Sequence, residues 1–162
     1  MAKIDTDVNI VPSLLDRLLD ENPDVSKEPV TSRIQGFRSY ERAVARDLEA
    51  LLNSRQETLE ELPSEFVEVS RSLMTYGLPD LTSLSLLSQD DRNRIRRAVE
   101  ESISAFEPRL QRVRVSLEAP REQDRGLRFR IDALLRVEPT PEPVTFDAVL
   151  HLNTQQYVVQ RD

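Results

Sequence analysis

The chain has 162 residues, and its 29 acidic and 22 basic residues give a formal net charge of −7. This length fits a single domain with a core of ordinary size and a tail at one end. The acidic balance disfavours broad binding to nucleic acid or to an anionic membrane surface. The sequence contains no cysteine, which excludes a disulfide framework, and no apolar run long enough to span a membrane. We therefore expect a cytosolic protein.

Residues 1–36 are predicted to form an N-terminal arm, made of a short amphipathic helix followed by a polar linker. The helix is expected between Pro12 and Asp20, where four leucines at helical spacing share one face: Leu14, Leu15, Leu18 and Leu19. A helix this short has little stability of its own and needs a surface on which to dock. Two interpretations remain open, a lid over the domain's own core or an arm that binds a partner through these leucines.

Residues 37–162 are predicted to form the main domain, which starts with a long helix. Ser39 is the expected N-cap of this helix, and an apolar stripe follows at helical spacing: Tyr40, Val44, Leu48, Leu51 and Leu52. The charged residues beside this stripe, among them Arg46, Asp47 and Glu49, are interpreted as a solvated face. The helix is expected to end near Asn53-Ser54-Arg55, because Asn and Arg both suit a helix C-terminus for local reasons.

A second long helix is predicted to begin at Ser88, with Asp90 and Asp91 in its first turn. Its apolar stripe consists of Ile95, Val99, Ile103 and Phe106. It should end within the segment Phe106-Glu107-Pro108-Arg109-Leu110, because proline cannot continue a helix and moves the residue before it out of the helical region. This corner also places a carboxylate and a guanidinium two positions apart, which a helix-to-strand corner alone does not require.

Alternating apolar residues predict strands after the corner. The first has Val113, Val115 and Leu117 on one face, the second Leu127 to Leu135, the third Phe146 to Leu152, and a short fourth runs from Gln156 to Gln160. The proline-rich segment 138–143 is expected to be neither strand nor helix. Helices followed by strands predict an α+β fold, with two main helices packed on an antiparallel sheet formed by the C-terminal half. Because the last strand is short and polar, its edge is expected to stay open for pairing with another chain.

Candidate catalytic residues are few. His151 has no second histidine or cysteine with which to form a metal site, and three glycines are too few for a phosphate-binding loop. The acidic pairs Glu60-Glu61 and Glu100-Glu101 have no apolar pocket to raise a pKa and no tryptophan to hold a sugar. We expect no catalytic residue, no metal site and no cofactor.

Four segments together carry a resemblance to a known family. They are Pro12 to Leu18, Val44 to Arg55, Tyr76-Gly77-Leu78-Pro79-Asp80-Leu81, and Phe106 to Leu110. In this order, spread over most of the chain, they resemble the TssE family of type VI secretion baseplate components, which is shared with a baseplate wedge protein of contractile-tailed phages. One departure is Ser54, where the family more often has threonine. The C-terminal strands match by pattern only.

The resemblance implies a non-enzymatic structural subunit of a cytoplasmic baseplate docked on the inner membrane complex. Its partners would be other wedge proteins (TssF, TssG and TssK), the sheath subunits TssB and TssC, and the spike hub, without nucleic acid and without direct membrane insertion. Such a subunit helps to nucleate the contractile sheath, and the motif implicated in assembly is matched here by Glu107, Pro108 and Arg109. Some relatives carry a lysozyme-like label, so a peptidoglycan-cleaving hydrolase is the alternative function, which a turnover assay on purified cell wall distinguishes from the first.

Overall fold

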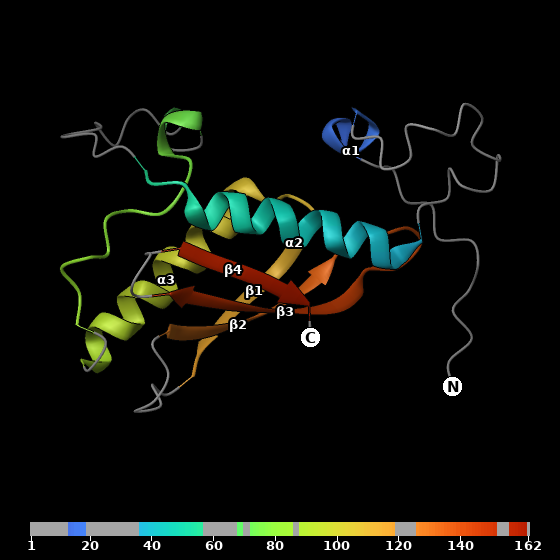
Figure 1. Cartoon of the computed structure of the whole chain (residues 1–162). Helices are drawn as coiled ribbons and strands as arrows, with labels where there is room; N and C mark the ends of the chain where they lie inside the picture. Colours follow the sequence, from blue (N-terminus) through green and yellow to red (C-terminus); the bar gives the residue numbers. More distant parts are fainter. Residues whose placement is uncertain are drawn as a thin grey trace.

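The computed structural model describes residues 13–18, 36–56, 68–69, 72–85, 88–118, 126–151 and 156–161. Two long helices lie against a four-stranded antiparallel sheet whose strands follow in chain order (Figure 1). The elements are α1 (Leu14–Leu18), α2 (Phe37–Asn53), the 3-10 turn η3 (Leu73–Thr75), α3 (Gln89–Phe106), β1 (Leu110–Leu117), β2 (Gly126–Leu135), β3 (Glu142–His151) and β4 (Gln156–Arg161). The predicted α+β class, with the sheet in the C-terminal half, is confirmed. No helix in these ranges is both long and apolar enough to cross a membrane.

The core lies between the two long helices and one face of the sheet. Helix α2 lies against β4 and α3 against β1, the two edge strands of the sheet. Both helices share one buried cluster with the sheet. Burial removes apolar side chains from water and is the main stabilising contribution to such a packing. The largest fully buried side chains come from both helices and from the sheet: Val44, Leu48, Val99, Ile103, Leu127, Phe129, Ile131, Leu135 and Phe146.

The two helix starts have different caps. Ser88 caps α3 as predicted, because its Oγ accepts a hydrogen bond from the backbone N–H of Asp91 at 3.3 Å. The predicted Ser39 cap of α2 is wrong. Helix α2 begins at Phe37 with Gly36 at the N-cap position, and no side chain caps its first turn. Ser39 lies inside that turn, where its Oγ accepts from Arg42 at 3.2 Å.

One strand boundary also differs from the prediction. Glu142 and Pro143, which the sequence placed in a loop, belong to β3, and Pro143 pairs with Leu134 of β2. Strand β4 pairs with β3 only from Phe146 to His151. Pro143 therefore lies where β3 has no neighbour on its second side, so the missing N–H leaves no ladder bond unmade there. Leu152, the predicted last residue of this strand, lies outside the described residues.

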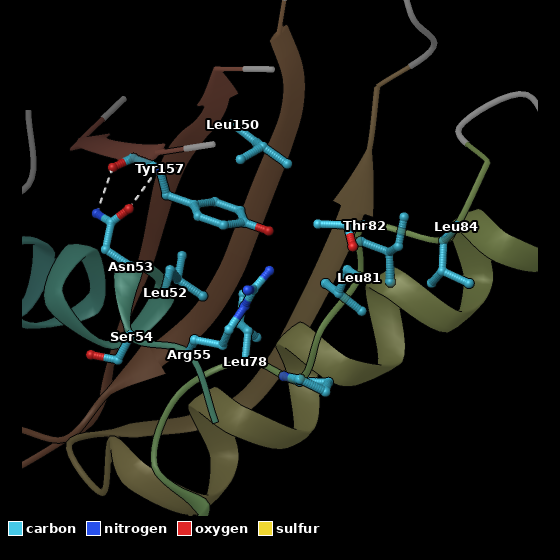
Figure 2. Close-up of a pocket in the computed structure, with 12 residues that line it drawn as sticks. Leu52, Asn53, Ser54, Arg55, Leu78, Leu81, Thr82, Leu84, Leu150 and Tyr157 are labelled. Carbon is cyan, nitrogen blue, oxygen red and sulfur yellow. Dashed lines mark hydrogen bonds between the residues drawn. The ribbon is translucent and has the colours of Figure 1, made fainter. Parts of the chain in front are cut away.

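The outer edge of β4 is closed by side chains of α2. Asn53 donates to the carbonyl of Tyr157 and accepts from its N–H, both at 2.8 Å (dashed lines in Figure 2), and Glu49 accepts from the N–H of Val159 at 3.0 Å. The predicted open edge is therefore wrong at Tyr157, whose N–H and carbonyl both bond to Asn53, and at the N–H of Val159. On the opposite edge, Glu100 of α3 accepts from the N–H of Val115 in β1 at 2.9 Å.

Replacing Asn53 by alanine should lower the free energy of unfolding by about 1–3 kcal/mol, because two hydrogen bonds to the backbone of β4 are lost. Ser54→Ala is a matched control, since the Ser54 hydroxyl donates to the carbonyl of Ala50 within the same helix; its effect should stay within about 0.5 kcal/mol. Urea unfolding of both variants measures the difference. Equal stabilities would show that Asn53 acts only as a local cap.

Candidate partner-binding site

The corner between α3 and β1 forms where the sequence predicted it. Helix α3 ends at Phe106, Glu107 is its C-cap, and the N–H of Glu107 donates to the carbonyl of Ile103 at 2.9 Å. The N–H of Leu110 then returns to the carbonyl of Glu107 at 3.1 Å, and β1 begins. Pro108 is exposed at the tip of this turn. The corner is therefore a closed turn with a rigid, solvent-facing proline.

Arg109 and Glu107 pair across the corner and tie it to α2. Arg109 Nε donates to Glu107 Oε1 at 2.7 Å, and Nη2 donates to the second carboxylate oxygen. The same Nη2 also donates to Oδ2 of Asp47, on α2, at 2.6 Å. Glu107 is only 4% exposed, so this is a largely desolvated arrangement rather than a surface ion pair. The sequence interpretation of Asp47 as part of a solvated face is wrong.

The guanidinium of Arg109 is charged and only partly satisfied. Burial by itself would lower the pKa of Arg109, but the hydrogen bonds and charges of Glu107 and Asp47 outweigh burial and raise that pKa above its ordinary value. Its Nη1 is buried without a hydrogen-bond partner within the described residues. The guanidinium carbon also lies 6.0 Å from the centre of the Tyr40 ring, within range of a cation–π contact.

A hollow of about 400 Å³ opens beside the corner, and residues from all four recognised segments line it. Ser13 comes from the first segment, Asp47 and Leu51 from the second, and Tyr76 from the third; the fourth contributes Phe106, Glu107, Pro108 and Arg109. The rings of Tyr76 and Phe106 meet edge to face with their centres 5.3 Å apart. The structure thus brings the predicted corner residues together with Asp47 and Tyr76, which the sequence analysis did not single out. Their only signal was their position inside the recognised segments.

Three of the four leucines predicted to bind a partner lie on α1 and are exposed. Leu14 is 74%, Leu15 50% and Leu18 73% exposed. Leu19 lies outside the described residues, as does the predicted linker apart from Gly36, its last residue. The interpretation of this face as a lid over the domain's own core is therefore wrong for these three leucines. Helix α1 is instead held to α2 by an ion pair between Asp16 and Arg46, with 2.7 Å between Oδ1 and Nη2.

A second hollow, of about 320 Å³, lies between the end of α2, the loop after Gly77, α3 and the sheet. Most of its lining is apolar, and the ring of Tyr157 faces Thr82 across it, with Arg55 below (Figure 2). Burial raises the pKa of Tyr157 to about 12. Arg55 pairs with Asp80 at 3.1 Å on the exposed rim. The lining includes the hydroxyls of Ser54, Thr82 and Tyr157, and its described residues contain no histidine, cysteine or carboxylate.

The segments around this second hollow bond to each other. The N–H of Leu78 donates to the carbonyl of Ser54 at 2.9 Å, and the N–H of Gln56 donates to the carbonyl of Leu78 at 2.8 Å. On the other side, the buried Ser102 hydroxyl of α3 donates to the carbonyl of Gly77 at 2.9 Å. Two of the recognised segments therefore have a direct structural role, which is to join the end of α2 to the loop that leads to α3.

A family profile described as baseplate wedge protein gp25 matches residues 38–140, well over half of the chain. The chain belongs to this family. The gp25 match begins in α2 and runs through α3, β1 and β2, so it contains three of the four recognised segments, including the corner. The first segment, with the exposed leucines, precedes the gp25 match. Membership in a family of baseplate wedge proteins assigns the chain a structural role in a baseplate.

Comparisons with curated proteins and with solved structures add no further assignment. Curated proteins yield no match to this chain. A chain in a solved structure titled "The baseplate complex from the type VI secretion system" is 18% identical, with 69% of this chain and 94% of that chain covered and a TM-score of 0.47. A likeness at this level adds nothing to the gp25 assignment.

Proposed function

We propose that the chain is a non-enzymatic baseplate subunit of a type VI secretion system that binds other wedge proteins and helps to nucleate the contractile sheath. The observation that supports this function best is the convergence of all four TssE-like segments on one hollow at the corner. In this proposal the partners are the wedge proteins TssF, TssG and TssK and the sheath subunits TssB and TssC, in a cytoplasmic baseplate on the inner membrane complex. The described residues give no specific support to the alternative, a peptidoglycan hydrolase.

The corner suits a partner contact because its own bonds hold it in shape. Glu107 and Arg109 are fixed by each other and by Asp47, and Pro108 has a restricted φ. A preformed surface loses little conformational entropy when a partner binds, so more of the contact energy appears as affinity. The exposed Pro108 and the adjacent hollow would then receive the partner, while the buried charges keep the corner rigid.

The N-terminal arm, residues 1–36, is proposed to be a second contact, separate from the wedge domain of residues 37–162. Exposed leucines on a short helix are typical of a segment that lays its apolar face into a groove of another protein. Because Leu14, Leu15 and Leu18 are exposed in the isolated chain, such binding would bury apolar surface without unpacking the core.

Replacing Leu15 and Leu18 together by aspartate should therefore weaken complex formation while leaving the melting temperature of the isolated protein nearly unchanged. Burying one such leucine contributes about 1.5–3 kcal/mol to the free energy of binding. Losing two of them should therefore reduce the affinity for the partner by about 100-fold or more. Co-purification with wedge and sheath subunits, with the full chain and with a chain lacking residues 1–36, measures the effect. The arm proposal fails if the double variant co-purifies as well as the parent, or if it melts at a much lower temperature.

A further inference from the structure

Five charged side chains form a continuous chain of ion pairs from α1 to the corner. Arg46 Nη2 lies 2.7 Å from Asp16 and 2.9 Å from Asp47, and Arg109 Nη2 lies 2.6 Å from the other oxygen of Asp47. Arg109 also pairs with Glu107. The charges alternate in sign, so each arginine lies between two carboxylates. Asp16 and Glu107, at the two ends, are thereby linked although they do not touch.

At the α1 end of this chain of ion pairs, hydrogen bonds hold the carboxylate of Asp16 in place. Asp16 Oδ2 accepts from the backbone N–H and the hydroxyl of Ser13, at 3.1 and 2.7 Å, while Oδ1 accepts from Arg46. The side chain of Asp16 is only 6% exposed. Its burial would raise the pKa of Asp16, but the hydrogen bonds from Ser13 and Arg46 outweigh this and lower it. Because the leucines of α1 face solvent, its attachment through Asp16 is electrostatic rather than hydrophobic.

We propose that α1 is an electrostatic strap on the corner, so that the charges of Glu107 and Arg109 control whether the N-terminal arm is docked or released. This inference deepens the proposed function and rests on it, because it gives the corner a means to report an occupied hollow to the arm. Partner binding at the corner and docking of α1 are coupled reciprocally. A change at the corner therefore alters the docking of α1, and docking of α1 alters partner binding at the corner.

The sign of the coupling follows from the charges. Three carboxylates and two guanidiniums leave one excess negative charge in the chain of ion pairs. Removing the charge of Arg109 raises this excess and frees Asp47 to compete with Asp16 for Arg46, so the arm should be released. Removing the charge of Glu107 neutralises the excess and turns Arg109 toward Asp47, so the arm should dock more firmly. By the same rule, a cationic group of a partner in the hollow holds the arm and an anionic group releases it.

The test uses two spin labels on the chain of 162 residues, which contains no native cysteine. Leu18→Cys on α1 and Ser116→Cys on β1 are both exposed sites, and pulsed dipolar spectroscopy measures the distribution of distances between the labels over a range of salt concentrations. The parent should show a narrow, docked population, and Asp16→Asn a broad, released one. Arg109→Gln should shift the ratio of docked to released protein about two- to fivefold toward release, as for one ion pair. Glu107→Gln should shift it toward docking.

Arg55→Gln is the matched control, because it breaks an arginine–aspartate pair with Asp80 outside this chain of ion pairs. Its distance distribution should equal that of the parent. If Arg109→Gln is unfolded at the temperature from which the samples are frozen, Arg109→Lys replaces it. Lysine keeps the charge but cannot bond to two carboxylates as the guanidinium does, so an intermediate release is expected. The strap is refuted if only Asp16→Asn moves the distribution, or if the parent is already as broad as Asp16→Asn. Neither result touches the proposed function, which co-purification with wedge subunits tests independently.

Discussion

Replacing Gly77 by alanine should lower the free energy of unfolding by about 2–4 kcal/mol, the sum expected for a strained backbone and an overpacked contact. Gly77 has a φ of 109°, which residues with a side chain rarely adopt. A Cβ at this position would lie 2.4 Å from the carbonyl oxygen of Ser54. That carbonyl cannot move away easily, because it accepts the N–H of Leu78 at 2.9 Å.

Gly36→Ala is the matched control for this change. Gly36 has a φ of −57°, and a Cβ there would meet no atom within 4 Å. Alanine is a somewhat poorer N-cap than glycine, so a loss of only about 0.5 kcal/mol is expected. Urea denaturation of the two variants provides the comparison. A Gly77→Ala protein as stable as Gly36→Ala would mean that the loop after η3 can separate from α2 without cost.

Arg109→Ala should abolish assembly with wedge and sheath subunits while the isolated protein remains folded but less stable. The structure changes the expected size of the stability loss. An exposed ion pair would contribute about 0–1 kcal/mol, but Glu107 is buried and loses its hydrogen-bonded partner, so a loss of about 1–3 kcal/mol is expected. Lost assembly must therefore be separated from lost stability.

Ile131→Val makes this separation possible, because Ile131 is fully buried in β2 and the change costs about 0.5–1.5 kcal/mol without touching the corner. Both variants are compared by co-purification at a temperature where circular dichroism shows both to be folded. Arg109→Ala should fail to co-purify and Ile131→Val should succeed. Equal recovery of partners with the two variants would make the corner a brace of the fold and not a binding site.

The sequence determined the features that depend on neighbouring residues. Ser88 predicts the start of α3, Pro108 predicts its end, and alternation predicts the faces of the first two strands, because caps, proline and side-chain period all act within a few residues. The four recognised segments also identified the family and placed the corner inside it. Where local signals competed, as between Ser39 and Gly36, the sequence prediction placed the N-cap of α2 three residues too late.

Only the tertiary structure decided which charges pair. Asp47 looked like part of a solvated face, yet α2 lies so that the Asp47 carboxylate accepts a hydrogen bond from Arg109, 62 residues away in the sequence. Asn53 looked like a helix cap, yet it bonds to Tyr157, 104 residues away, and closes an edge that the polar last strand seemed to leave open. An apolar pattern shows which face of a helix is buried, but the partner of a polar side chain depends on how whole elements pack, and that packing is set by the core rather than by the local sequence.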